Sequence, residues 1–227
     1  MLQLREKEIF ETLKRMGRFT FVIIGGYAVN AYTLPRFSVD CDIVVKDKGE
    51  LKEIEEALVS FGYVKEENNK AKTSYYGDFL RLEKDLGENI EVSMDILIKE
   101  VLDRQTNATF SAEWIFDNSK VIALRGKTIT EELKLRIISL DALFILKFVS
   151  CRLTDIRDIF MLVPNIKNKK WVKEEISEKY NFDKLFLKIK EKITSKQFKD
   201  SLQGVYGIID DKVFEKHKKA ILDLEKI

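Results

Sequence analysis

A glycine pair that directly follows an apolar segment, and that thirteen intervening residues separate from two aspartates, constrains this chain more than any other feature. The apolar segment, residues 21–24, has the composition of a buried strand, and Gly25 and Gly26 come immediately after it. Glycine allows a sharp turn and a close approach of the backbone to a ligand. The short helix that we expect next, to about Tyr32, begins with free N–H groups that favour phosphate. The pattern therefore predicts a strand, a turn and a helix that together bind a phosphate.

The two aspartates, Asp40 and Asp42, lie on an expected strand over residues 40–45. Alternate residues of a strand share a face, so both carboxylates point one way while Cys41 points the other way. The usual rise per residue separates the two by about 7 Å along the strand, a spacing from which they can converge on a divalent cation. We therefore expect Asp40 and Asp42 to be metal ligands.

A phosphate site beside two carboxylates suggests an enzyme that handles a nucleoside triphosphate. Transfer of a nucleotidyl group commonly uses two metal ions about 3.5–4 Å apart, so a third carboxylate is expected from a neighbouring strand. Asp95 is the best candidate, since it is the one acid in the apolar run of residues 94–97. Glu91 shares its face of the expected strand over 90–98, and Glu83 on the preceding strand is a weaker rival. A phosphate site beside three carboxylates indicates an enzyme that uses a nucleoside triphosphate with Mg²⁺, or with Mn²⁺ as the alternative.

The order of the expected elements predicts an α/β (α+β) fold. A small, mixed, twisted sheet has helices mainly on one side, and a helical C-terminal region follows. We place a catalytic domain at residues 1–130 and a helical domain at 131–227. Expected helices cover 3–16, 49–61, 140–151 and 155–163, with several more over 171–227, and Gly62 is an expected C-terminal cap. Further strands are expected at 63–66, 73–83 and 90–98, with a hairpin formed by 121–124 and 127–129.

Composition excludes several classes of protein. The net charge of the 227 residues is +2, so charge alone gives no argument for nucleic acid or a membrane as partner. No apolar run is long enough to span a bilayer, and the N-terminal residues do not resemble a signal peptide. Cys41 and Cys151 provide neither a disulfide framework nor zinc-ligand spacing. We therefore expect a cytoplasmic protein with no membrane partner.

The combined pattern resembles the signature of the DNA polymerase β-type nucleotidyltransferase superfamily, in which a hydrophobic residue and two small residues precede Asp-x-Asp at this distance. Here the first part is Ile24-Gly25-Gly26 and the second is Asp40-Cys41-Asp42. Arg36-Phe37-Ser38, just before the aspartates, resembles the Arg-x-Ser-x-Asp-x-Asp form of the AbiEii-like, minimal nucleotidyltransferase branch. The runs 143–147 and 154–159 resemble the later helical motifs of those members.

The resemblance implies a role for each matching residue. Gly25 and Gly26 would hold the β- and γ-phosphates, Asp40 and Asp42 would bind magnesium, and Asp95 would be the third ligand or the base. The other implied nucleotide contacts are Arg36, Ser38, Lys147 and Asp155. Many relatives have Ser where this chain has Gly26, so a hydroxyl that contacts phosphate is missing from that position.

Each helical candidate also has a plain structural interpretation. Lys147 could cover apolar surface with its stem, and Asp155 could belong to a charge cluster favoured by the helix dipole. Arg36 could be an ordinary surface residue. His217 is expected to face solvent, and the lysines of the last helices could either follow an RNA backbone or form a solvated face.

We therefore expect a metal-dependent nucleotidyltransferase that moves a nucleoside monophosphate from an NTP to an acceptor hydroxyl and releases pyrophosphate. A toxin-like enzyme would modify a tRNA end, and an antitoxin protein would be its partner. The alternatives are an antibiotic-type enzyme with a small-molecule acceptor and a catalytically silent nucleotide-binding module.

Overall fold

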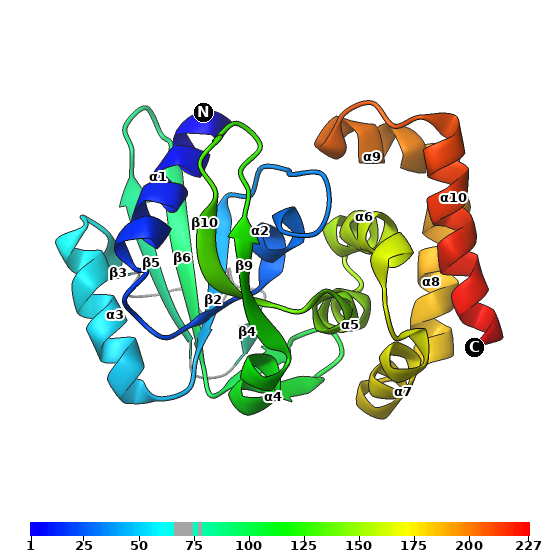
Figure 1. The fold of residues 1–227 in the computed structure, drawn as a ribbon, viewed down its shortest axis with the longest axis horizontal. Coiled ribbons are helices and arrows are strands. Elements are labelled where there is room, and N and C mark those ends of the chain that lie inside the picture. The colour runs from blue at the N-terminus through cyan, green and yellow to red at the C-terminus, as the bar shows by residue number, and fades with distance from the viewer. Residues whose placement is uncertain (66–74, 77–78) are drawn as a thin grey trace. The chain divides into compact units, whose positions relative to one another are not determined.

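The computed structural model describes residues 1–65, 75–76 and 79–227 and forms two compact units (Figure 1). The first unit comprises residues 1–31 and 35–138, and the second comprises 32–34 and 139–227. The division falls between Ile138 and Ser139 rather than after residue 130, because the strand over 133–138 belongs to the sheet of the first unit.

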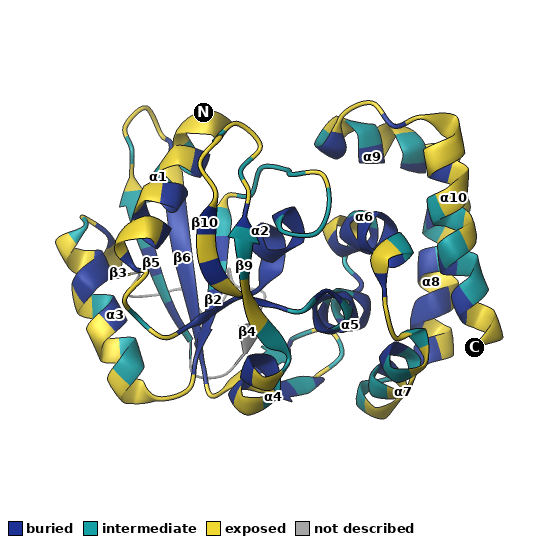
Figure 2. Ribbon diagram, viewed as in Figure 1, coloured by how far each residue is buried: buried dark blue, intermediate teal, exposed yellow. Residues whose placement is uncertain are grey.

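A seven-stranded mixed sheet forms the centre of the first unit, as the sequence predicts, in the order β3-β5-β6-β2-β1-β10-β9. Two pairs, β1 with β10 and β2 with β6, are parallel, and the remaining neighbours are antiparallel. The middle of the sheet is the most buried part; all of β6 except its first residue is buried (Figure 2). The strands are β1 (Val22–Ile23), β2 (Asp40–Val45), β3 (Val64–Lys65), β5 (Phe79–Asp85), β6 (Glu91–Ile98), β9 (Ser119–Leu124) and β10 (Leu133–Ile138).

A smaller antiparallel sheet has the order β4-β7-β8 and also belongs to the first unit. Its strands are β4 (Tyr75–Tyr76), β7 (Glu100–Asp103) and β8 (Thr109–Ser111), and α4 (Ala112–Asp117) follows. The expected strand over 73–83 corresponds in part to β4 and β5, and its other residues lie outside the described part of the chain. Residue 66, the last of the strand expected over 63–66, also lies outside the described part of the chain.

Two helices of the first unit, α1 (Leu2–Arg15) and α3 (Lys48–Ser60), pack against the large sheet (Figure 1). The apolar face of α1, with Ile9 and Leu13, is fully buried. Asp47 caps α3 by accepting hydrogen bonds from the backbone of its first turn. Gly62, with a φ of +90°, follows its C-terminal end as expected.

The prediction that residues 127–129 form a hairpin with the strand over 121–124 is wrong. Strand β9 pairs instead with β10 over six consecutive residue pairs, from Leu133 opposite Leu124 to Ile138 opposite Ser119. The backbone N–H groups of Lys127 and Thr128 donate to the carboxylate of Glu6 on α1, at 2.6 and 2.8 Å. Residues 127 and 128 therefore bind a distant side chain rather than a neighbouring strand.

The second unit contains six α-helices in the described residues, together with the short helices η1 (Val163–Asn165) and η2 (Asp223–Lys226). Ser139 is the N-cap residue of the first of them, although its side chain makes no capping hydrogen bond. Aromatic rings form much of the core: Phe148 stacks on Phe182 with ring centres 5.2 Å apart, and Phe160 packs against Phe198 at 5.1 Å. The helices are α5 (Leu140–Ser150), α6 (Leu153–Leu162), α7 (Lys169–Lys179), α8 (Phe182–Thr194), α9 (Phe198–Tyr206) and α10 (Asp211–Leu222).

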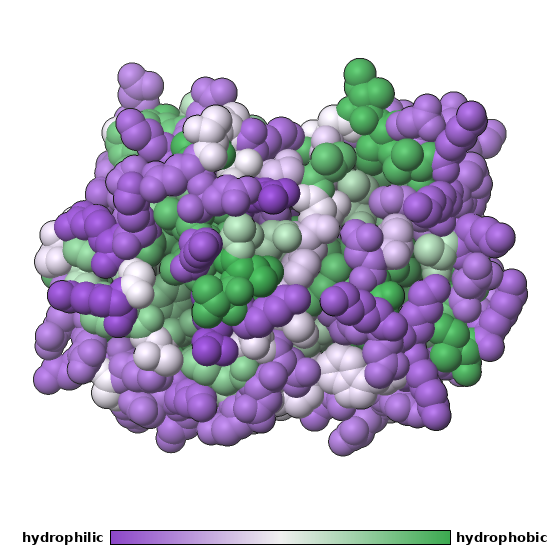
Figure 3. Space-filling view, in the orientation of Figure 1, coloured by the Kyte–Doolittle hydropathy of each residue, from purple (hydrophilic) through white to green (hydrophobic). Residues whose placement is uncertain are grey.

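Hydrophilic side chains cover most of the face shown in Figure 3, with smaller hydrophobic areas between them. Within the described residues, no helix combines the length and the apolar character that crossing a membrane requires.

Candidate active site in the first unit

The register of the large sheet brings the three predicted carboxylates together. In the parallel pair of β2 and β6, Asp42 lies beside Asp95, and Asp40 lies beside Ser93. Directly paired residues of neighbouring strands project from the same face of a sheet. Asp40, Asp42 and Asp95 therefore share one face. Cys41 points to the other face, where it is fully buried and burial raises the pKa of its thiol.

An arginine that the sequence analysis did not single out lies among these carboxylates. Arg81 of β5 pairs with Asp95 in the register, and its side chain is 14% exposed. Its guanidinium contacts Asp40 Oδ1 at 2.9 Å, Glu83 Oε1 at 3.0 Å and Asp95 Oδ2 at 3.6 Å. Burial alone would lower the pKa of Arg81, but the carboxylates around it raise that pKa overall. Ser93 completes the group by donating to Asp40 Oδ1 at 2.6 Å.

Asp95 is the most perturbed member of this group. It is 4% exposed, and its Oδ1 atom is buried without a hydrogen-bond partner. Burial, followed by repulsion from Asp42, Asp40 and Glu83, raises the pKa of Asp95 to about 8, although Arg81 acts in the opposite direction. A buried carboxylate oxygen with no donor favours binding of a cation or a proton.

The composition of the site fits Mg²⁺, because its oxygen-bearing side chains are the ligands that hard cations prefer. The unpartnered Asp95 Oδ1 would be available to such a cation. In the described part of the chain, no three acidic, cysteine or histidine side chains stand in a ready-made arrangement for a metal ion. Arg81 is the cation that contacts both Asp40 and Asp95 in this structure.

The glycine pair packs tightly against the face of the sheet that carries Asp40, Asp42 and Asp95, which we call the acidic face. Gly25, with a φ of +64°, begins the short helix α2 (Gly25–Asn30), and a Cβ atom there would lie 1.8 Å from Asp42 Oδ2. A Cβ atom on Gly26 would lie 2.5 Å from Ser38 Oγ and 3.1 Å from Arg36 Nη2. Only glycine fits both positions without displacing these side chains. The Ser38 hydroxyl thus lies where a side chain at position 26 would be.

The segment that contains Arg36 and Ser38 is held by side chains of α2. Asn30 donates to the carbonyl of Arg36 at 2.9 Å and accepts from its N–H at 3.0 Å. Tyr27 donates to the carbonyl of Ser38 at 3.4 Å. Arg36, Ser38 and the two glycines therefore form one connected loop region. Asn30, which is 1% exposed, is a positioning residue that the sequence analysis missed.

The remaining predicted residues, Lys147 and Asp155, meet in the second unit. Lys147 Nζ lies 2.8 Å from Asp155 Oδ1 and 3.0 Å from Asp158 Oδ2, and all three side chains are largely buried. Tyr206 at the end of α9 donates to Asp158 Oδ1 at 2.6 Å. Lys147 is thus part of a buried ion network rather than a lysine that covers apolar surface.

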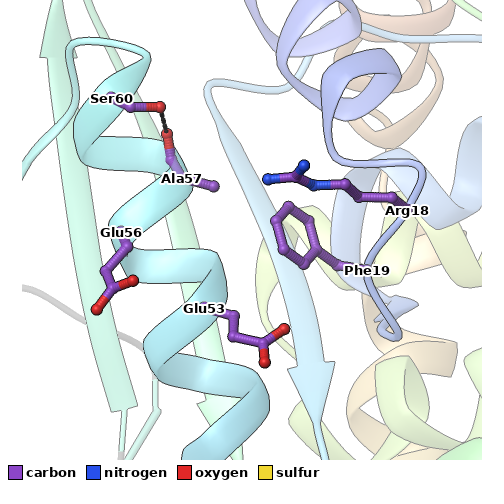
Figure 4. A pocket seen from close by; sticks show the side chains of 6 residues that line it. All are labelled: Arg18, Phe19, Glu53, Glu56, Ala57 and Ser60. Carbon is purple, nitrogen blue, oxygen red and sulfur yellow. Dashed lines mark hydrogen bonds between the residues drawn. The ribbon is translucent and has the colours of Figure 1, made fainter.

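A separate hollow on the first unit lies between α3 and the segment after α1 (Figure 4). Arg18 and Phe19 point toward α3, while Glu56 points away from Arg18 (Figure 4). The hollow shares no lining residue with the acidic face. Its lining residues are Arg18, Phe19, Glu53, Glu56, Ala57 and Ser60.

A family model described as nucleotidyl transferase AbiEii toxin, type IV TA system, matches residues 18–221. The chain belongs to this family. It is therefore a nucleotidyltransferase, and its chemistry is NTP-dependent nucleotidyl transfer. The predicted resemblance is confirmed, and the match extends well beyond the last resembling motif, residues 154–159. No curated protein sequence matches the chain.

Solved structures support the fold. The nucleotidyltransferase toxin MenT4 from Mycobacterium tuberculosis H37Rv is 16% identical, with a TM-score of 0.60 over 100% of this chain and 83% of that one. The antibiotic-resistance factor ANT(2'')-Ia is 17% identical, with a TM-score of 0.51 over 78% of this chain and 92% of that one. A nucleotidyltransferase-like protein from Paracoccidioides brasiliensis is 14% identical, with a TM-score of 0.50 over 92% and 97%. At these identities the likeness concerns the fold alone.

Proposed function

We propose that this AbiEii-family enzyme uses Mg²⁺ to transfer a nucleoside monophosphate from an NTP to the hydroxyl at a tRNA end. The observation that carries the chemistry is the shared face of Asp40, Asp42 and Asp95, with Gly25 packed directly against Asp42. The description of the family as a toxin favours an RNA acceptor over a metabolite. The fold shared with ANT(2'')-Ia keeps a small-molecule acceptor as the second candidate.

In the reaction, the acceptor oxygen forms a bond to the α-phosphorus, and the bond from that phosphorus to the bridging oxygen breaks. Pyrophosphate leaves with the bonding electrons. Asp40, Asp42 and Asp95 would hold the magnesium, which supplies charge neutralisation on the phosphates. If Asp95 is not itself bound to the metal, it is the alternative candidate to receive the proton of the acceptor hydroxyl.

The triphosphate would bind to the loop region of Gly25, Gly26, Arg36 and Ser38. Glycine at both positions permits a close approach to the backbone, and Arg36 adds a positive charge beside Gly26. The Ser38 hydroxyl would replace the one that many relatives carry at position 26. Lys147 and Asp155 remain proposed nucleotide contacts because of the motif resemblance; in this structure Lys147 binds Asp155 and Asp158.

Label transfer tests the proposal. The protein is incubated with each α-labelled NTP, Mg²⁺, and either total tRNA or a small-molecule extract. Asp42→Asn should lower transfer at least about 1,000-fold, because it weakens charge stabilisation that is worth several kcal/mol. Asp117→Asn, which changes an exposed aspartate of the same unit, is the matched control and should retain activity.

The acceptor that carries the label separates the two candidates. Label on tRNA that disappears with Asp42→Asn or with EDTA supports the proposal. Label confined to small molecules would favour the antibiotic-type activity. Undiminished transfer by Asp42→Asn would overturn the assignment of the acidic face.

We also infer an antitoxin partner, because the family belongs to a type IV toxin–antitoxin system. Expression of the wild-type chain alone should arrest growth, and expression of Asp42→Asn should not. Coexpression of the gene product encoded next to it should restore growth. Equal growth with the wild-type chain and the variant would contradict a toxin role.

A further inference from the structure

Arg81 occupies a place in the acidic face that the proposed chemistry leaves unexplained. Its guanidinium contacts three carboxyl groups, those of Asp40, Glu83 and Asp95. It also donates to Ser93 Oγ at 2.8 Å. A charged group held by this many partners is a built feature of the site rather than a surface ion pair.

The contacts of Arg81 divide into two sets. Glu83, two residues along β5, binds Nε, while Asp40 binds Nη2 and Asp95 lies nearest Nη1. Only Asp40 and Asp95 belong to the proposed metal ligands. The guanidinium can therefore release these two ligands and still remain bound to the site through Glu83.

We propose that Arg81 competes with the metal ion for Asp40 and Asp95. In the metal-free protein its guanidinium holds the two carboxylates in place of a cation. When Mg²⁺ binds, Arg81 gives up Asp40 and stays on Glu83. The competition weakens metal binding, because a fixed positive charge beside the ligands repels a second one. The inference rests on the proposed function only in taking Asp40 and Asp95 as metal ligands.

Metal affinity distinguishes this role from a purely structural one. Mn²⁺ binding to the full chain without nucleotide is measured from the free-ion signal by electron paramagnetic resonance. Arg81→Gln should bind Mn²⁺ at least about tenfold more tightly than the wild type, since it removes one unit of positive charge within contact distance. Arg81→Lys keeps the charge and should stay close to the wild type. If Arg81 only held the ligands in position, its removal would weaken Mn²⁺ binding, and that result would overturn the proposal.

Arg125→Gln is the matched control. Arg125 is an exposed arginine of the same unit that forms an ion pair with Glu132 at 2.7 Å, so this variant makes the same substitution away from the acidic face. Its Mn²⁺ affinity should equal that of the wild type. An equal rise in affinity for Arg125→Gln and Arg81→Gln would also overturn the proposal, because the effect would then come from net charge alone.

A measurement on the wild-type chain decides the matter if Arg81→Gln does not fold. The Nε–H signal of Arg81, identified by its loss in Arg81→Lys, should shift on addition of Mg²⁺, while that of Arg125 stays in place. Saturation with Mg²⁺ without a shift of the Arg81 signal would overturn the exchange. Failure of label transfer would instead count against the proposed function, because metal binding and the Arg81 signal are read without any NTP or acceptor.

Discussion

At the residue scale, Gly25 is the most constrained position of the site. Alanine there would have to adopt a φ of +64°, which costs an L-residue about 1–2 kcal/mol, and its Cβ would collide with Asp42 Oδ2. We expect Gly25→Ala to displace the Asp42 carboxylate and to lower transfer at least about 100-fold. The free energy of unfolding from urea titration and the rate of label transfer measure the two effects.

Gly87 in the turn between β5 and β6 provides the matched control. Its φ is +87°, but a Cβ atom there would meet no atom within 4 Å. Gly87→Ala should therefore show the backbone cost and keep its transfer rate. Equal losses of activity in the two alanine variants would show that the contact with Asp42 is unimportant.

The single histidine, His217, should make stability depend on pH. Contrary to the sequence-based expectation it is half-buried, and its Nδ1 lies 2.9 Å from the carbonyl oxygen of Phe160. Burial lowers the pKa of His217, so the unfolded chain binds this proton at a higher pH than the folded chain does. The stability from neutral His217 is complete above the unfolded pKa of about 6.5 and is lost as the pH falls below it.

Urea midpoints at pH 7.5 and pH 5 test this prediction. The wild type should lose more stability over this interval than His217→Gln, whose side chain does not titrate. Parallel losses in both proteins would assign the pH dependence to carboxylates instead.

At the scale of elements, Glu6 joins helix α1 to the turn between β9 and β10. Its carboxylate is 1% exposed and accepts hydrogen bonds from Lys127 N, Thr128 N and Thr128 Oγ1, all at 2.8 Å or less. Glu6→Gln removes the charge and replaces one acceptor oxygen by a donor. We expect a loss of about 3 kcal/mol in the free energy of unfolding, since hydrogen bonds to charged groups contribute about 1.5–3 kcal/mol each.

The control is Glu11→Gln, which changes an exposed residue of the same helix and should stay within about 0.5 kcal/mol of the wild type. Urea titrations of both variants at pH 7 provide the comparison. A cost for Glu6→Gln no larger than that for Glu11→Gln would show that the turn is held by other contacts.

The hairpin of β9 and β10 could be predicted from the sequence only in part. The sequence correctly predicts a strand over 121–124, but the expected turn at Arg125-Gly126 puts its partner at 127–129 instead of 133–138. The alternation of Leu133, Leu135 and Ile137 with polar residues was a readable signal for β10. The hydrogen bonds from residues 127 and 128 to Glu6 could not be predicted from the sequence, because their acceptor lies on a helix more than a hundred residues earlier.

The residues of the acidic face could also be predicted only in part. Asp40 and Asp42 could be predicted from their alternate positions on one strand and their spacing from the glycine pair, and Asp95 because it is the one acid in the apolar run of residues 94–97. The contact of Arg81 with them could not, because a charged pair on alternate positions of a strand is equally typical of a solvated edge. Only the register of β5 against β6 places Arg81 beside Asp95.

At the scale of the whole molecule, β10 decides where the first unit can be cut. It pairs with both β1 and β9, and four of its aliphatic side chains are buried: Leu133, Leu135, Ile137 and Ile138. Burial of each contributes about 1.5–3 kcal/mol, so their sum is comparable to the total stability of about 5–15 kcal/mol of a domain. A chain cut after residue 130 should therefore lose its cooperative unfolding transition in urea.

A chain cut after residue 138 retains β10 and should unfold cooperatively. The two truncated chains differ by eight residues, so circular dichroism during urea titration compares them directly. Cooperative unfolding of the shorter chain would show that β10 is dispensable for the sheet.

The pairing of β1 with β10 has a consequence for a growing polypeptide. Residue 23 is parallel to residue 137, so the strand that leads into the glycine turn stays open on one side until the ribosome has made more than half of the protein. An unfinished chain released before residue 133 would carry Gly25, Asp40, Asp42 and Asp95 without the strand that pairs with β1. Fragments of this kind should therefore be inactive, and a cell that makes this enzyme is exposed to its activity only from copies that extend past β10.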